Sequence, residues 1–208
     1  MKMRLENKCC LEIMAEYPDN YFHLAHVDPP YGLKYSKNPA RQKFQKKDWD
    51  SAAPNEDYFK ELFRVSRNQI IWGGNYFPFL WQNPCKHFVF WYKGNPVENF
   101  ADGEMAWTSF DFPAKCFDYR YYGNLEGNTS ASKKIHPTQK PRSLYRWSFD
   151  NYAKKDFRIL DTHLGSGNHA IEAFYFGVEE FVGCEIDKEY FSKVQKNIRE
   201  NTLQTTLF

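Results

Sequence analysis

The sequence has little that would tie the chain to a membrane, a metal ion or an oxidising compartment. No apolar run approaches the ~20 residues that a membrane-spanning helix needs, and the polar segment Met1–Lys8 has no signal-peptide core. The five cysteines are scattered and form no C-x-x-C pair, which argues for reduced thiols and against a zinc site. We therefore expect a cytoplasmic protein with no metal ion and no membrane partner.

A strong charge of one sign is absent as well. The formal net charge is +2, so any surface for nucleic acid must be a local patch rather than a global positive field. The chain has no internal repeat, and its 208 residues can bury a sizeable core in one domain, residues 1–208. Aromatic residues, at 19%, are abundant, and such rings serve both cores and base stacking.

Hydrophobic periodicity and turn residues predict alternating strands and helices, the pattern of a doubly wound α/β fold. The expected strands are 22–27, 69–72, 87–92, 158–161 and 180–184. The expected helices are 10–17, 55–65, about 141–153, 169–176 and a last helix capped by Asp187. Gly73 and Gly74 follow one strand, where they allow either a simple turn or the close approach of a ligand.

The chain is organised around four residues, Asp28, Pro29, Pro30 and Tyr31, which directly follow strand 22–27. Two prolines cannot continue a sheet ladder, and open α/β sheets bind ligands where such strands end. The Asp28 carboxylate can accept a hydrogen bond from an exocyclic amino group, and a proline carbonyl can accept a second. Tyr31 can stack on the ring that carries the amine. The alternative is a tight turn capped by the aspartate.

The C-terminal part of the chain has the layout of a nucleotide-binding site. Strand 158–161 is followed by Gly165-Ser166-Gly167, a helix, strand 180–184 and Glu185. The glycines let the backbone approach a ligand, the helix start offers N–H groups, and Glu185 can hold ribose hydroxyls. Residues 165–170 also fit the dinucleotide fingerprint G-x-G-x-x-A, so an NAD-dependent oxidoreductase is an alternative.

These motifs resemble those of S-adenosylmethionine (AdoMet)-dependent amino-methyltransferases. Residues 28–31 resemble the catalytic motif in the form that suggests adenine N6; in cytosine-N4 enzymes serine often replaces the aspartate. Residues 161–167 resemble the AdoMet motif, and His136–Pro141 resembles the segment that precedes it in the circularly permuted β-type enzymes. The order of the motifs is the β-type order. We expect the strands that end at Asp28 and Asp161 to be neighbours in the sheet, which would place the two motifs at one switch point. The likeness covers most of the chain and extends to small phage and bacterial DNA adenine methyltransferases.

The resemblance implies a Rossmann-like methyltransferase fold, AdoMet as cofactor and double-stranded DNA as substrate. Lys140 would meet the AdoMet carboxylate and Glu185 the ribose. The implied cofactor-binding residues are Asp28, His136, Thr138, Lys140, Asp161, His163, Leu164, Gly165, Ser166, Gly167, Glu185 and Ile186. The chain departs from the family pattern in two places. Thr162-His163 stands where Pro-Phe is frequent, and no acid precedes Cys9.

Two regions are candidates for contact with DNA. The first is a basic loop at about residues 33–53, which lies next to the catalytic motif and suits phosphate contact, or is simply solvated. The second is an aromatic-rich target-recognition insertion at about 95–135, which could instead cover the sheet. The candidate DNA-binding residues are Lys34, Lys37, Arg41, Lys43, Lys46, Lys47, Tyr122, Lys133 and Lys134.

The sequence as a whole predicts methyl transfer from AdoMet to adenine N6 of a base flipped out of DNA. The alternatives are a cytosine-N4 or RNA methyltransferase, the NAD-dependent oxidoreductase, and a catalytically inactive homologue that binds nucleic acid. Pro84-Cys85 superficially resembles a cytosine-C5 nucleophile. It lacks the expected surroundings, so we interpret Cys85 as structural.

The segment Gln204–Phe208 resembles the short Gln-x-x-Leu-Phe peptides that dock bacterial replication and repair proteins on the sliding clamp. A mobile tail would place two apolar side chains and one amide in a preformed groove at a small ordering cost. The interpretation that we prefer is a tail folded back, with Leu207 and Phe208 filling a gap on their own domain. A sliding clamp and a second copy in a homodimer stay as alternative partners.

Overall fold

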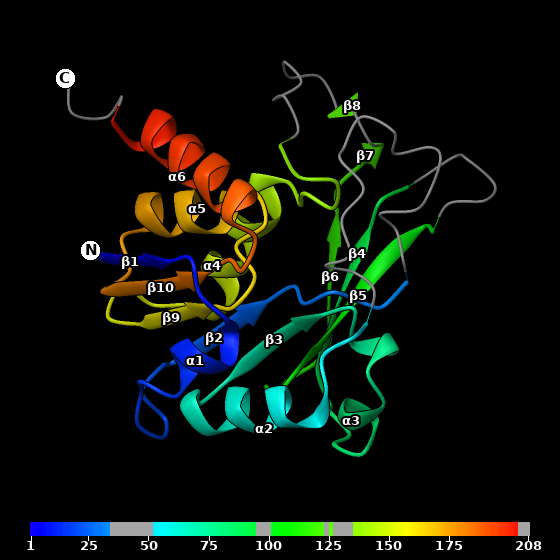
Figure 1. Ribbon diagram of the computed structural model, residues 1–208. Coiled ribbons are helices and arrows are strands. Elements are labelled where there is room, and N and C mark those ends of the chain that lie inside the picture. Colours follow the sequence, from blue (N-terminus) through cyan, green and yellow to red (C-terminus); the bar gives the residue numbers. More distant parts are fainter. Residues whose placement is uncertain (34–51, 95–100, 123–124, 127–134, 204–208) are drawn as a thin grey trace.

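The computed structural model describes residues 1–33, 52–94, 101–122, 125–126 and 135–203. Its main strands are β1 (Lys2–Glu6), β2 (Leu24–Val27), β3 (Gln69–Trp72), β4 (Phe88–Tyr92), β5 (Gly103–Thr108), β6 (Lys115–Asp118), β9 (Arg158–Asp161) and β10 (Glu180–Cys184). Within the described residues they form one sheet in the order β1-β10-β9-β2-β3-β5-β4-β6 (Figure 1). Neighbours run parallel except around β5, which is antiparallel to both β3 and β4.

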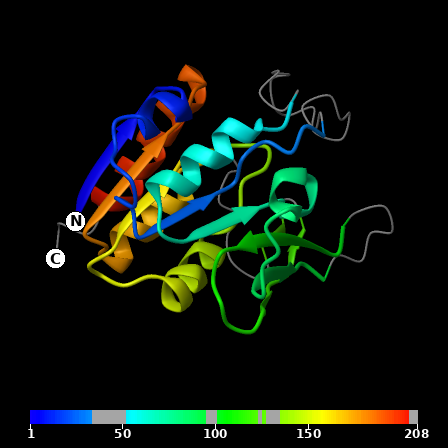
Figure 2. The same ribbon diagram turned by 90° about the horizontal axis from the view of Figure 1, so that it is seen from below.

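Helices cover both faces of this sheet. They are α1 (Cys10–Met14), α2 (Glu56–Val65), α3 (Pro78–Trp81), α4 (Arg142–Tyr152), α5 (Asn168–Phe176) and α6 (Lys188–Thr202), with a 3-10 turn η3 (Gly74–Tyr76). Helices α4, α5 and α6 lie on one face and α1, α2 and α3 on the other (Figures 1 and 2). A separate two-stranded ladder pairs β7 (Tyr121–Tyr122) with β8 (Leu125–Glu126).

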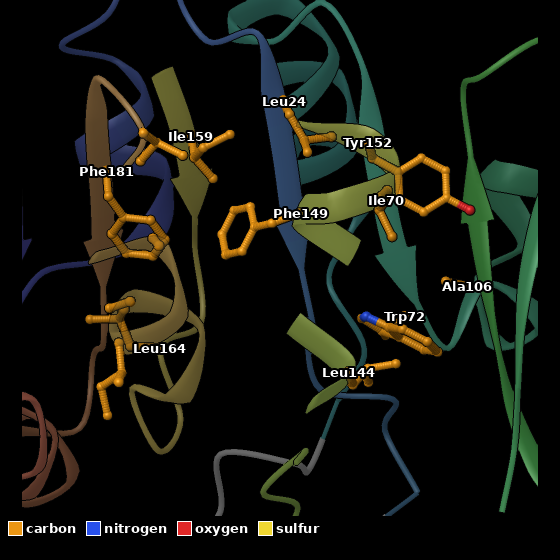
Figure 3. Packing of buried hydrophobic residues seen from close by; sticks show 14 of the residues in the cluster. Leu24, Ile70, Trp72, Ala106, Leu144, Phe149, Tyr152, Ile159, Leu164 and Phe181 are labelled. Atoms are coloured by element: carbon orange, nitrogen blue, oxygen red, sulfur yellow. The ribbon is translucent and has the colours of Figure 1, made fainter. Parts of the chain in front are cut away.

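Two hydrophobic cores result, because successive side chains of a strand point to opposite faces of the sheet. Leu24 and Ile70 pack with Phe149 toward the α4 and α5 side (Figure 3). Their neighbours in sequence, Ala25 and Ile71, belong to the core under α1 and α2. This two-sided burial is complete in the central parallel strands β2 and β3, where all four residues of each strand are buried.

Most of the expected elements are confirmed, and three strands, β3, β9 and β10, have the predicted bounds. The two helix caps also follow local chemistry. Asn55 accepts a hydrogen bond from the Tyr58 N–H at the start of α2, and Asp187 accepts two at the start of α6. No helix in the described part of the chain is long and apolar enough to cross a membrane, and all five cysteines are free thiols.

Two features of the sheet differ from the expectation. The region 95–135 is not wholly an insertion, because its segments β5 and β6 complete the central sheet. The edge strand β1 was not predicted, although Lys2–Glu6 alternates charged and apolar residues, the pattern of a half-buried strand. Met3 and Leu5 pack against the core, while Arg4 reaches Glu6 and Glu16.

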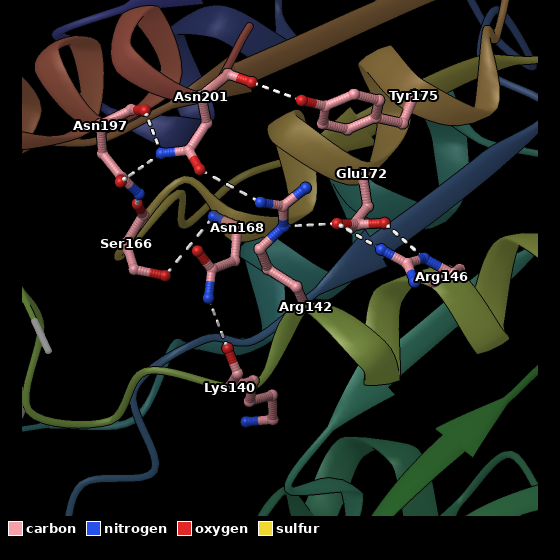
Figure 4. Close-up of polar contacts among 9 residues, drawn as sticks. All are labelled: Lys140, Arg142, Arg146, Ser166, Asn168, Glu172, Tyr175, Asn197 and Asn201. Atoms are coloured by element: carbon pink, nitrogen blue, oxygen red, sulfur yellow. Dashed lines mark hydrogen bonds and ion pairs between the residues drawn. The ribbon is translucent and has the colours of Figure 1, made fainter. Parts of the chain in front are cut away.

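A buried acid ties the three helices of one face together (Figure 4). The Glu172 side chain on α5 is 1% exposed and forms ion pairs with Arg142 and Arg146 of α4. Arg142 also donates to Asn201 of α6 at 3.1 Å. A buried carboxylate is tolerated only when it is paired in this way, so the cluster fixes the position of α4 and of the segment that leads into it.

Candidate active site

The two sequence motifs meet at one edge of the sheet. Strand β2, which ends at Asp28, pairs in parallel with β9, which ends at Asp161; Leu24 is opposite Ile159 and Ala25 opposite Leu160. Because parallel neighbours end at the same edge, the turn at residues 28–31 and the glycine loop at residues 165–167 lie side by side, as predicted.

Asp28 is anchored through both of its carboxylate oxygens. The Tyr31 hydroxyl donates to Oδ1 at 2.7 Å, and the Lys140 ammonium lies 2.6 Å from Oδ2. The side chains of Asp28 and Lys140 are 18% and 4% exposed. Burial raises the pKa of Asp28 above its ordinary value, although the Lys140 charge opposes this shift. The arrangement presents a carboxylate of increased basicity next to an aromatic ring.

The Tyr31 ring is positioned by the segment that follows β3. Gly73 has φ +71°, and a Cβ there would lie 2.2 Å from Cε1 of Tyr31, so the glycine backbone packs against the ring. Tyr76 stacks on Tyr31 with 5.1 Å between ring centroids. A Cβ on Gly74 would in turn lie 2.5 Å from Cβ of Trp107. The space beside Gly73 and Gly74 is therefore filled by the side chains of Tyr31 and Trp107.

Two charged residues at this edge were not found from the sequence. The Glu104 carboxylate on β5 lies 3.2 Å from the Lys140 ammonium and also pairs with Lys93, which follows β4. Burial alone would raise the pKa of Glu104, but Lys140 and Lys93 hold it at about 2. Both residues lie in segments without a recognisable motif, so only the pairing of β4 and β5 brings them to the site.

Lys140 has a different environment from the one implied by the resemblance. Its ammonium lies between Asp28 and Glu104, and donates to the Tyr31 hydroxyl at 3.3 Å. Burial lowers the pKa of Lys140, but the two carboxylates outweigh it and the net shift is upward. Contact with a cofactor carboxylate would require Lys140 to leave one of these partners.

Asp161 and Leu164 build the glycine loop. Asp161, 3% exposed, accepts the His163 N–H at 3.0 Å through Oδ1, and its Oδ2 lies 2.9 Å from Nδ1 of His169. Burial raises the pKa of Asp161 to about 6 and lowers that of His163 to about 4. Leu164 fills the space that the missing Cβ of Gly183 leaves.

Glu185 closes the loop at the end of β10. Its Oε2 accepts the Gly165 N–H at 3.3 Å, and its Oε1 accepts the Asp187 N–H at 3.0 Å. Burial raises the pKa of Glu185. Next to it, Ile186 is 66% exposed, so a carboxylate and an accessible apolar side chain stand together.

The segment 136–140 lies against the glycine loop. A Cβ on Gly165 would be 3.7 Å from His136 Nδ1, and the Asn168 side-chain amide donates to the Lys140 carbonyl at 2.8 Å (Figure 4). His136 accepts the Thr138 N–H at 3.4 Å. Ser166 and Gly167 complete the loop, with the Ser166 carbonyl accepting from Asn197 and Gly167 capping α5.

Most candidate DNA-binding residues lie outside the described residues. These are Lys34, Lys37, Arg41, Lys43, Lys46, Lys47, Lys133 and Lys134, and the tail Gln204–Phe208 also lies outside. Tyr122 belongs to β7. The structure does not test these assignments, which stay predictions.

Fold and site together place a nucleotide-type glycine loop and the half-buried Asp28 carboxylate at adjoining strand ends of an α/β sheet. The sequence profile of a family described as DNA methylase matches residues 91–196, just over half of the chain. The chain belongs to this family of AdoMet-dependent DNA amino-methyltransferases. The NAD-dependent oxidoreductase is therefore left without support.

Individual relatives agree with this assignment. The chain is 25% identical to the Type II methyltransferase M2.MboI of Moraxella bovis, over 93% of this chain and 86% of that protein. It is 25% identical to the Type II methyltransferase M.HinfI of Haemophilus influenzae, over 92% and 67% respectively. Two solved structures share the fold. The M1.HpyAVI–SAM complex has a TM-score of 0.64 at 18% identity, covering 94% of this chain and 98% of that one. The cytosine-N4-specific PvuII DNA methyltransferase has a TM-score of 0.65 at 13% identity, covering 97% and 91%.

Proposed function

We propose that the protein transfers a methyl group from AdoMet to N6 of adenine in double-stranded DNA. The observation that carries the proposal is the Asp28 carboxylate, held beside the Tyr31 ring at the edge where the glycine loop lies. An ionised carboxylate is a strong acceptor for an amino group. The names of the relatives include both general Type II enzymes and a cytosine-N4 enzyme. The assignment of adenine as the target base therefore depends on the aspartate of the motif, Asp28.

The loop residues fit the adenosine end of AdoMet. Glu185 offers carboxylate oxygens to ribose hydroxyls, and the exposed Ile186 offers an apolar surface to the adenine ring. Gly165 has φ +54°, a left-handed backbone that favours glycine, and a Cβ there would be in ordinary contact with His136, 3.7 Å from its Nδ1. We assign Gly165, Glu185, Ile186, His136 and Thr138 to cofactor contact, while Asp161, Leu164 and Gly167 shape the loop.

AdoMet supplies an electrophilic methyl group on a sulfonium sulfur. The chain has to hold the target amino group in line with it, and in this proposal Asp28 and the carbonyl of Pro29 or Pro30 accept its two hydrogens. These hydrogen bonds favour a pyramidal nitrogen with its lone pair turned toward the methyl group. Tyr31 stacks on the flipped base. The amino nitrogen forms its bond to the methyl carbon as the carbon–sulfur bond breaks, S-adenosylhomocysteine leaves, and the methylated nitrogen then loses one proton to solvent. No covalent enzyme intermediate forms, and Cys85 packs against the core.

The test is transfer of tritium from labelled AdoMet to DNA, followed by digestion and mass spectrometry of the nucleosides. We expect N6-methyladenine. N4-methylcytosine would refute the adenine assignment while keeping the class of enzyme, and label on RNA alone would refute DNA as substrate. AdoMet binding without transfer to any of these substrates would identify an inactive homologue.

The Glu185→Ala variant is expected to weaken AdoMet binding by about 10- to 100-fold, because hydrogen bonds to a charged group contribute about 1.5–3 kcal/mol. Isothermal titration calorimetry measures the dissociation constant directly. Glu179→Ala removes an exposed acid just before β10 and should leave it unchanged. An unaltered affinity in Glu185→Ala would show that this carboxylate does not meet the ribose.

Replacing Lys43, Lys46 and Lys47 with alanine tests the basic loop. Each phosphate contact that is lost should flatten the slope of log affinity against log salt by about 0.9. The slope is measured by fluorescence anisotropy with duplex DNA. Lys196→Ala, which removes an exposed lysine of α6, is the matched control. If the triple variant keeps the wild-type slope, the loop does not contact phosphates.

A further inference from the structure

Five polar side chains form a continuous line at the carboxyl edge of the sheet. In order they are Tyr31, Asp28, Lys140, Glu104 and Lys93. They come from the turn after β2, the segment before α4, strand β5 and the end of β4. Two carboxylates and two ammonium groups balance one another within this line. The single cation between the two acids is Lys140, which is 4% exposed.

Glu104 is held unequally by its two lysines. Its Oε1 is hydrogen-bonded to Lys93. Its Oε2 is buried and lies 3.2 Å from the Lys140 ammonium, a longer contact than the 2.6 Å between that ammonium and Asp28. A closer approach of Lys140 to Glu104 would strengthen this charged contact.

The target amino group would need the Asp28 oxygen that the Lys140 ammonium occupies. Asp28 already binds the Tyr31 hydroxyl through Oδ1 and the Lys140 ammonium through Oδ2. An ammonium at 2.6 Å withdraws charge from the carboxylate and weakens it as an acceptor. The ammonium lies only slightly farther from Glu104, at 3.2 Å, so a small movement of the Lys140 side chain would release Asp28 Oδ2.

We propose that Glu104 is a positioning residue of the methyl transfer, which takes over the Lys140 ammonium when Asp28 binds the amino group of the target base. This inference rests on the proposed function and adds a residue that acts through Lys140. Lys93 controls how strongly Glu104 attracts Lys140, because the Lys93 ammonium on Oε1 neutralises part of the Glu104 charge.

The Glu104→Gln variant keeps the shape of the side chain and removes its charge. Lys140 should then stay on Asp28, and the plateau value of kcat should fall by about 100-fold, as for a misplacement of about 1 Å. The negative charge of Glu104 raises the pKa of Asp28. Loss of the Glu104 charge should lower the pKa of Asp28. Since the reaction needs ionised Asp28, the acid limb of the plot of kcat against pH should move to lower pH.

Lys93→Met is expected to shift the acid limb in the opposite direction. Glu104 then has Lys140 as its remaining cation in the line and draws it away from Asp28. The pKa of Asp28 should rise, and the acid limb of the kcat–pH profile should move to higher pH. The Lys93 ammonium lies 4.5 Å from the centroid of the Trp91 ring, and methionine keeps an unbranched side chain of similar size beside that ring. If Glu104→Gln fails to fold, this variant carries the test, and an unmoved or lowered limb overturns the proposal.

Glu180→Gln is the matched control, because Glu180 is also a buried acid but pairs with Lys2 and Tyr21 at the start of β10, at the opposite edge of the sheet from Asp28. It should lower Tm and leave the acid limb in place. Plateau kcat at the wild-type level in Glu104→Gln would overturn the proposal, even if the limb moved. Titration of the Asp28 carboxyl by ¹³C NMR in the cofactor-free protein tests the charge coupling without turnover. A wild-type protein that methylates no DNA would refute the proposed function and leave that measurement to decide the coupling.

Discussion

Asp28→Ala is expected to lower kcat for methyl transfer by about 100- to 1000-fold, the cost of removing one preorganised hydrogen-bonding group from a transition state. The variant leaves the target amino group without its charged acceptor. It should still fold, because the Lys140 ammonium keeps Glu104 as a partner. Tritium transfer from AdoMet to DNA under saturating conditions measures the effect, and thermal unfolding checks the fold.

Two further variants sharpen this experiment. Asp28→Asn keeps the shape of the side chain and one carbonyl oxygen but loses the charge, so we expect most of the loss to persist. Cys85→Ser should retain full activity, because the thiol packs against the core and takes no part in the chemistry. A near wild-type rate in Asp28→Ala would refute the assigned role. A large loss in Cys85→Ser would point to a cysteine nucleophile instead.

Gly73→Ala is expected to have the second large effect, through the position of Tyr31. The added Cβ would lie 2.2 Å from the Tyr31 ring, so the ring must leave its place beside Asp28. We expect kcat/KM on DNA to fall by about 100-fold, as for a misplacement of about 1 Å. Forcing alanine to φ +71° adds a loss of stability of about 1–2 kcal/mol.

Gly177→Ala separates these two contributions. Gly177 also has a left-handed backbone, with φ +80°, but a Cβ there would meet nothing within 4 Å. It should therefore show the loss of stability alone, measured by urea denaturation, and normal steady-state kinetics below its unfolding range. Equal kinetic losses in the two variants would show that backbone strain, and not the ring of Tyr31, controls activity.

The sequence was sufficient to place a site residue wherever its position depends on neighbouring residues in the chain. Asp28 follows an apolar strand and precedes two prolines, so its place at a strand end is decided by neighbours in the chain. The glycine loop and Glu185 lie within one strand–loop–helix–strand unit, whose bounds at β9 and β10 were predicted correctly. The pairing of β2 with β9 followed from the general rule that such sites form where the strand order reverses.

Tertiary structure alone decided which charges surround Asp28. Glu104 lies in a stretch without a regular period and Lys93 directly follows a predicted strand, but only the antiparallel pairing of β5 with β4 brings the two residues to Lys140. The role of Gly73 likewise depends on the Tyr31 ring, which folds back from a distant turn to meet it. A buried ion pair or a close packing contact forms between side chains that lie far apart in the chain. Its free energy therefore depends on distances that local sequence patterns do not encode.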